Sequence, residues 1–418
     1  MRKLFAKIHL WLSIPFGIII AIICLTGAIL VFETEIQELC HPSHYFVKEV
    51  KGEPLPPAAL IESARRQLPD SIKINGIRVT PDPKRTYQLV LPGKKAAAFI
   101  DPYTAEVTGI NDGQGFFMQM MRLHRWLLDS YKRDGSFSLG KALVGYSTLI
   151  LAIILISGIV IWYPRNRKAL KNRLKIKANA GWYRFFYDLH VAGGFYSTLL
   201  LLVLTLTGLT WSFGWYRDAF YTAFGVETTQ PQAHAPAPSA QQEQPEDKKP
   251  GERGRGERGS DDRGANDRPA GEKREGNRER GGHPERSGSS ERKERQQKRT
   301  DYTVWANVLS DLQHRYPAYN SITIQDGSAS VSAARYGNTR GSDRYTFDAT
   351  TGQITDIQLY KDLPKSGKIR GWIYSVHAGT WGGMTTKILS CLVSFLGAVF
   401  AITGYYFWIK KKMRKRKK

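Results

Sequence analysis

The sequence has few cysteines and lacks the motifs of several enzyme classes. Three of its 418 residues are cysteine, which excludes a disulfide framework as the source of stability. No G-x-G-x-x-G follows a strand-like run, and neither a Walker motif nor a Ser/His/Asp pattern is present. The basic stretch 164–183 is too short for a flavin or nicotinamide domain. If the chain carries electrons, they must therefore come from a membrane quinol or from another protein.

Long apolar runs, in contrast, are plentiful. The mean hydropathy of -0.36 reflects a long polar stretch that dilutes four apolar runs, each nearly free of charge. Each run is close to the roughly 20 residues that a helix needs to cross a bilayer, so we expect four membrane-spanning helices in lipid. The first run follows basic residues but precedes no signal-peptidase site, which favours an uncleaved anchor. The four runs are 9–32, 143–162, 191–213 and 388–409.

The placement of Lys and Arg predicts the orientation. Basic residues crowd the segments 164–183 and 410–418 and also precede the first run. The positive-inside rule therefore places both segments and both termini in the cytoplasm. The net charge of +24 is explained by topology and by attraction to lipid, so we expect no nucleic-acid partner.

The segments between the helices repeat one plan. Helix-like 57–67 precedes strand-like 87–91, 97–100 and 106–108, while helix-like 304–315 precedes strand-like 321–331, 344–347 and 353–355. The pair "FIDPYTAEVTGI" and "YTFDATTGQITDI" supports a repeat. The stretch 228–300 is rich in Pro, Ala and Gln and then in charged residues and Gly, so we expect a disordered insertion that acts as a spacer.

These patterns predict an α-helical integral membrane protein with four transmembrane helices in two tandem repeats and two small α+β domains outside the membrane. The predicted transmembrane helices are 1–33, 139–163, 184–214 and 385–409. The predicted outer domains are 34–138 and 301–376, with a basic loop at 164–183, the insertion at 228–300 and a basic tail at 410–418.

Four of the nine histidines occupy matching places in the two halves. His9 and His190 each precede the glycine of a Thr-Gly pair by 18 residues, which is about 27 Å along a helix. His124 and His377 stand ahead of the second and fourth helices, at the outer face. Interfacial histidine is often tolerated without a role, but ionisable residues at membrane depth are functional candidates.

Two histidines at each face suit axial ligation of a haem iron inside a helix bundle. Zinc would need three or four ligands together. A proton relay through Glu33, Glu35 and Asp188 remains an alternative, and Cys40 with the H-x-x-H at 41–44 is a weak metal motif. Nearby small residues leave room for a flat macrocycle or simply allow close helix packing; these are Gly17, Gly27, Gly158, Gly193, Gly194, Gly208 and Gly404.

The motifs "KIHLWLSIPFG…LTG", "MRLHRWLL", "DLHVAGGFY…LTG" and "SVHAGTWGG", with the turns "DPYTAEVTG" and "DATTGQITD", resemble the PepSY-associated transmembrane family. The resemblance covers almost everything except 228–300, although Leu10 to Ser13 departs from the family's usual basic residue and glycine. It implies PepSY-like outer domains in a bacterial inner-membrane protein.

The resemblance also implies two haem b groups, with His9 and His190 as axial ligands of the inner iron and His124 and His377 of the outer iron. Electrons would then reach a ferric siderophore or another iron chelate at the periplasmic face, while the residues of the catalytic step stay unknown. The alternative is a non-enzymatic protein without a cofactor, whose PepSY-like domains bind or restrain a partner such as a peptidase.

Overall fold

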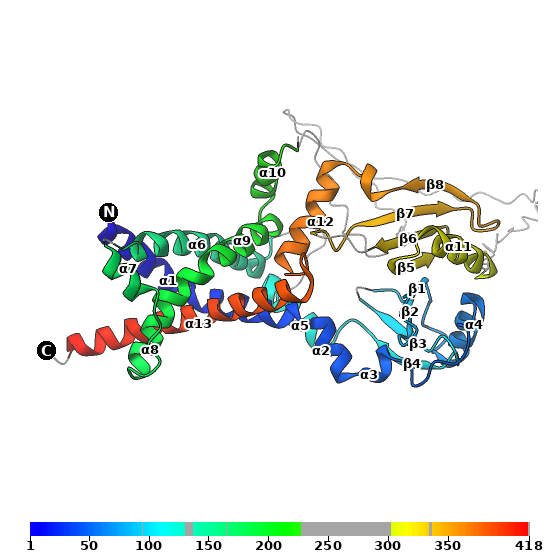
Figure 1. The fold of residues 1–418 in the computed structure, drawn as a ribbon, viewed down its shortest axis with the longest axis horizontal. Coiled ribbons are helices and arrows are strands. Elements are labelled where there is room, and N and C mark those ends of the chain that lie inside the picture. Colours follow the sequence, from blue (N-terminus) through cyan, green and yellow to red (C-terminus); the bar gives the residue numbers. More distant parts are fainter. Residues whose placement is uncertain (94, 130–136, 165, 227–301, 334–336, 417–418) are drawn as a thin grey trace, which may run out of the picture. The chain divides into compact units, whose positions relative to one another are not determined.

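Four long helices dominate the N-terminal, central and C-terminal parts of the chain (Figure 1). The structure is a computed structural model that describes residues 1–93, 95–129, 137–164, 166–226, 302–333 and 337–416. Four helices in these ranges are long and apolar enough to cross a membrane, which confirms the expected four spans. They are Arg2–Val31, Leu139–Trp162, Trp182–Ser212 and Gly383–Arg414. The predicted insertion at 228–300 lies outside the described residues.

Small residues let these helices approach closely. In α1 (Arg2–Val31), Gly17 leaves room for the ring of Tyr405 on α13 (Gly383–Arg416): a β-carbon built there would lie 2.9 Å from a ring carbon. A β-carbon on Gly397 would likewise lie 3.0 Å from the Sγ of Cys24. Close helix packing therefore explains several of the glycines in the apolar runs.

The spans lie close to the predicted ranges, with local differences at their ends. Phe32 interrupts the first helix, and the chain continues as α2 (Glu33–Cys40) and α3 (Pro42–Tyr45). The third span consists of α8 (Trp182–Asp188), a π-helical turn (Leu189–Gly193) and α9 (Gly194–Ser212). Residues 410–416, predicted as a tail, continue α13. The second span is α6 (Leu139–Trp162), which begins where the Ser138 hydroxyl accepts the backbone N–H of Lys141.

Several short helices lack a long apolar run and were not predicted. Two of them carry outer histidines: α5 (Phe116–Trp126) and α12 (Lys365–His377). The others are α7 (Arg167–Arg173), α10 (Gly214–Ala223) and the 3₁₀ turn Tyr360–Asp362.

The strands of both outer segments form one antiparallel sheet of eight strands, in the order β4-β3-β2-β1-β5-β6-β7-β8. The two segments meet where β1 pairs with β5 and Ile77 faces Ile324. The helices α4 (Pro57–Gln67) and α11 (Tyr302–Arg315) pack side by side on the sheet, and one apolar core joins them (Figure 1). The strands are Gly76–Val79, Tyr87–Val90, Ala97–Ile100, Val107–Asn111, Tyr319–Gln325, Ser328–Ala333, Ser342–Phe347 and Ile354–Gln358.

Each half of the sheet contains the same type of turn. Between β3 and β4, Asp101 accepts the backbone N–H groups of Tyr103 and Thr104; between β7 and β8, Asp348 accepts those of Thr350 and Thr351. The single strand expected at 321–331 is wrong, because Gly327 has φ +66° and the chain turns there to form the β5–β6 hairpin.

Candidate functional site

The four histidines lie in two pairs. His9 on α1 and His190 in the π-helical turn have ring centres 6.5 Å apart, with ring planes at 77°. His124 near the end of α5 and His377 at the end of α12 have ring centres 6.2 Å apart, with planes at 51°. Each pair therefore joins one residue from each half of the chain.

In the first half of the chain, the histidine ring Nδ1 lies against a hydroxyl and a carbonyl of a long helix. His9 Nδ1 is 3.1 Å from both Ser157 Oγ and the Ile154 carbonyl oxygen on α6. His124 Nδ1 is 3.2 Å from Thr26 Oγ1 and 3.0 Å from the Ile23 carbonyl oxygen on α1. In both cases the hydroxyl residue comes three positions after the carbonyl.

The second half repeats this arrangement. His377 Nδ1 is 3.1 Å from Thr207 Oγ1 and 2.9 Å from the Leu204 carbonyl oxygen on α9. His190 Nδ1 is 2.9 Å from Thr403 Oγ1 on α13. The four sites thus share one design, which includes the Ser-Gly and Thr-Gly pairs of the sequence.

These contacts determine which ring nitrogen carries the proton. Each hydroxyl already donates to a carbonyl of its own helix: Thr26 to Ile22 at 2.7 Å, Thr207 to Val203 at 2.8 Å, Ser157 to Ile154 at 2.8 Å and Thr403 to Phe400 at 3.1 Å. A carbonyl oxygen can only accept, so a ring Nδ1 that lies against one donates, and the hydroxyl oxygen is its second acceptor. The Nε2 lone pair is then available to a metal, as in most metal-binding histidines.

The glycine after each hydroxyl residue leaves room for the imidazole. A β-carbon on Gly27 would lie 3.1 Å from His124 Cε1, and one on Gly208 would lie 3.0 Å from His377 Cε1. The corresponding distances are 3.6 Å from Gly158 to His9 and 3.9 Å from Gly404 to His190. Glycine is thus required most strictly at the outer pair.

The spacing of the ring centres in each pair is compatible with one metal ion between two imidazoles. A metal–nitrogen bond of about 2.0 Å and about 1.1 Å from nitrogen to ring centre place two opposed ring centres about 6.2 Å apart. The described ranges contain no group of three or more His, Cys, Asp or Glu residues that could hold a metal ion. A group that needs only two protein ligands, as a haem does, is compatible with each pair.

Burial favours the neutral form of His124 and His377. It lowers the pKa of His124 to about 4, and burial together with neighbouring His124 lowers the pKa of His377 to about 4. Both imidazoles are therefore neutral at ordinary pH.

The other residues considered in the sequence have partners of their own. The carboxylates of the possible proton relay are held in ion pairs, Glu35 with Lys387 at 2.5 Å and Asp188 with Arg184 at 2.9 Å. The rings of His41 and His44 stack with centres 5.1 Å apart, without forming a three-ligand group.

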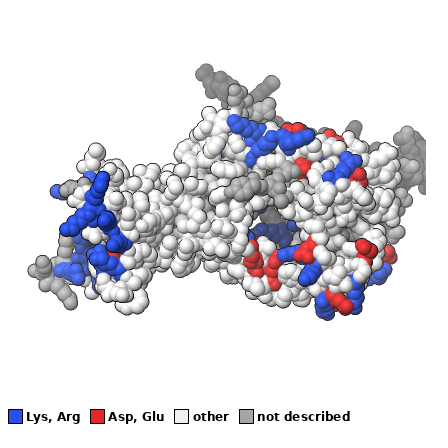
Figure 2. Space-filling view, viewed as in Figure 1, with Lys and Arg blue, Asp and Glu red and all other residues white. Residues whose placement is uncertain are grey.

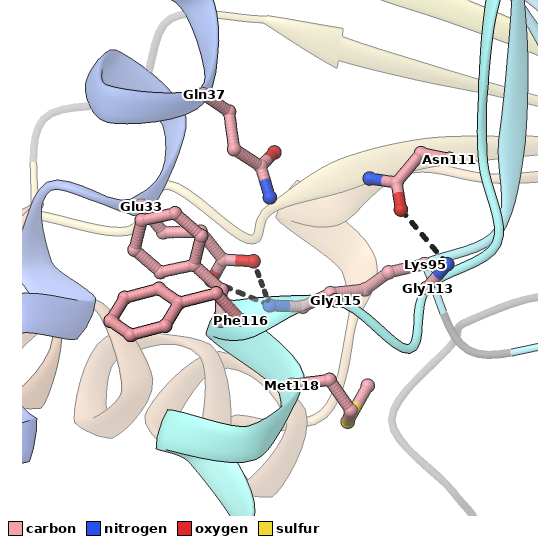
Figure 3. A pocket seen from close by; sticks show the side chains of 9 residues that line it. Glu33, Gln37, Lys95, Asn111, Gly113, Gly115, Phe116 and Met118 are labelled. Carbon is pink, nitrogen blue, oxygen red and sulfur yellow. Dashed lines mark hydrogen bonds and ion pairs between the residues drawn. The ribbon is translucent and has the colours of Figure 1, made fainter. Parts of the chain in front are cut away.

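A pocket lies between α2 and the start of α5, with Glu33 and Lys95 paired at 2.6 Å across it (Figure 3). Gln37, Asn111 and Met118 also line it, and none of the four paired histidines does. The pocket is therefore separate from the histidine pairs.

The hydroxyl residues Ser157, Thr26, Thr207 and Thr403 received no role from the sequence alone. The recurring Ser-Gly and Thr-Gly pairs were the visible signal, but which ring faces each hydroxyl depends on the helix neighbours.

Fold and site define a multi-pass membrane protein with an antiparallel sheet beside its four spans and paired histidines in its helical part. The family described as "PepSY-associated TM region" matches residues 6–411, so the chain belongs to this family. No curated protein matches the chain.

Proposed function

We propose that this protein is a bacterial inner-membrane electron carrier that binds two b-type haems and reduces a ferric siderophore or a similar iron chelate at the periplasmic face. The observation that carries the proposal is the fourfold site design, with Nδ1 engaged by a helix and ring centres spaced for one metal. His9 and His190 hold the inner group, and His124 and His377 hold the outer one.

The chain's own contribution is to hold and insulate these ligands. When bound, two haems at different depths of the apolar bundle would supply one-electron carriers across the bilayer. Four hydroxyl groups fix the ring orientation and increase the electron density at Nε2, because each accepts a hydrogen bond from an Nδ1–H group. They belong to Ser157, Thr26, Thr207 and Thr403. Water is kept out of the interface between α1 and α13 by a cluster of buried residues, which are Ile20, Cys24 and Ala398.

Trp211 supports the outer pair as the point of electron exit. Its ring centre is 5.1 Å from that of His377, and 37% of the residue is exposed. An electron at the outer pair therefore reaches the surface of the bundle through one aromatic side chain.

The ligand assignment is tested with single His→Ala variants of the purified full-length protein. His124→Ala and His377→Ala should each remove the low-spin signature of one haem, while the matched control His44→Ala keeps both. Visible and electron paramagnetic resonance spectra measure this. A His124→Ala protein with two fully ligated low-spin haems would contradict the assignment.

The substrate is tested by mixing the dithionite-reduced protein, freed of excess reductant, with ferrioxamine B. Haem reoxidation at the rate at which an iron(II) trap such as ferrozine gains colour is the expected result. Stable reduced haem in the presence of excess chelate would remove siderophores of this class as substrates.

A further inference from the structure

The second half of the chain continues each histidine pair with an aromatic ring. Trp211 comes four residues after Thr207 and contacts His377, while Phe407 comes four residues after Thr403, with its ring centre 6.0 Å from that of His190. The corresponding residues of the first half, Leu30 and Ile161, are aliphatic. Among the described residues, an aromatic side chain four positions after the hydroxyl residue therefore occurs only in the second half of the chain.

At the inner pair the rings continue to the surface. The ring centre of Phe407 lies 5.5 Å from that of Tyr183 and 6.0 Å from that of Tyr187. Tyr183 is 41% exposed and Tyr187 is 45% exposed. An unbroken series of neighbouring rings thus leads from the outside of α8 to His190.

Two cations lie over the exposed end of this series. Lys410 Nζ is 5.1 Å from the ring centre of Tyr183, and Arg414 Cζ is 5.8 Å from it. The Lys410 ammonium also donates to the hydroxyl of Tyr406 at 2.8 Å. These contacts keep positive charge at the entrance of the aromatic series.

The surrounding surface is strongly basic. Lys and Arg gather around α7, α8 and the C-terminal turns of α13, whereas both charge signs mix over the sheet (Figure 2). The stretch 388–409 carries no charge and is about 33 Å long as a helix, close to the hydrocarbon thickness. The cations from Lys410 onward therefore lie beyond the hydrocarbon, where a water-soluble protein can reach them.

We propose that Tyr183, Tyr187, Lys410 and Arg414 form the docking face for an acidic one-electron carrier protein, here called the entry face. Phe407 connects this face to His190. The inference rests on the proposed electron transfer. One electron leaves the reduced cofactor of the carrier and enters the inner site, without transfer of a proton or group. Anionic lipid would satisfy the charge but would not account for rings that connect the charge to His190, so we favour a protein partner.

The test uses the full-length, haem-loaded protein in nanodiscs of neutral phosphatidylcholine. Photoreduced plant-type [2Fe–2S] ferredoxin, an acidic protein of low potential, serves as the donor, and stopped-flow absorbance follows haem reduction. The double variant Lys410→Glu/Arg414→Glu should lower the second-order rate at least about tenfold at low salt, with the difference shrinking at 1 M salt.

The matched control is Lys411→Glu/Lys412→Glu, which changes the charge equally on the same helix but has no contact with Tyr183 among the described interactions. It should change the rate less than about threefold. Phe407→Leu should slow reduction while ferredoxin binding stays unchanged. Dithionite should reduce every variant equally.

Equal losses in both double variants would overturn the entry face, and so would a Lys410→Glu/Arg414→Glu rate equal to wild type. If both double variants bind phosphatidylglycerol vesicles more weakly than wild type to the same extent, while their ferredoxin rates stay unchanged, the basic residues bind lipid instead. A protein that binds no haem would show no change of haem absorbance with dithionite. Failure of the proposed function is therefore distinguished from failure of the entry face.

Discussion

The smallest unit of the site is a histidine, a hydroxyl residue and a glycine. The hydroxyl donates to its own helix and accepts from Nδ1, while the glycine makes room for the ring. Because this unit occurs four times, single substitutions at equivalent positions serve as controls for one another.

Thr207→Val removes the hydroxyl that accepts from His377 but keeps the shape of the side chain. We expect the outer haem to bind about 10- to 100-fold more weakly, because the ring loses the partner that fixes its tautomer. Thr207→Ser should restore binding. Haem retention during dilution and spectroelectrochemical titration measure this; equal behaviour of Val and Ser variants would show that the hydroxyl does not act on the ring.

Gly208→Ala and Gly404→Ala compare the tight outer site with the roomier inner one. The alanine methyl would lie 3.0 Å from His377 Cε1 but 3.9 Å from His190 Cε1. We expect Gly208→Ala to shift the outer haem spectrum and lower its occupancy, while Gly404→Ala remains close to wild type. Identical spectra of the two variants would contradict the steric account.

At the scale of elements, the apolar runs predicted the four long helices, and the Asp turns marked the hairpins β3–β4 and β7–β8. Helix α4 has the predicted bounds, 57–67. These features depend on local sequence, which explains why they could be predicted.

Features that depend on distant residues were not predicted. β1 has four residues, and its burial comes from pairing with β2 and β5. The short helices α5 and α12 are 11 and 13 residues long and lack a long apolar run, so they gave no membrane signal. The same limit concealed the hydroxyl partners of the histidines, because each lies on a helix far away in the chain.

Ile324→Ala tests whether the two halves of the sheet are stabilised together. Ile324 is fully buried and faces Ile77 across the β1–β5 junction, so its truncation should cost about 2–5 kcal/mol. Hydrogen exchange should then accelerate in both 76–111 and 319–358. Ile357→Ala on the edge strand β8, where the side chain is 46% exposed, should change stability by less than about 1 kcal/mol.

Exchange that accelerates in 319–358 alone would indicate that the two halves of the sheet unfold separately. Exchange that accelerates in both halves would show that the apolar core shared by α4 and α11 makes them one cooperative unit.

At the scale of the whole molecule, the two halves of the chain meet both in the helices and in the sheet. Each histidine pair takes one residue from each half, and the sheet joins strands from both halves. The proposed direction of electron flow runs from the entry face through the inner pair to the outer pair and Trp211.

The most direct test of this account is the haem content of the purified wild-type protein, expressed with sufficient haem and measured by the pyridine haemochrome spectrum with a protein count. The account predicts two b-type haems per chain, both low-spin in the oxidised state and both reduced by dithionite. Well-folded protein without haem, or with one haem per chain, would contradict it.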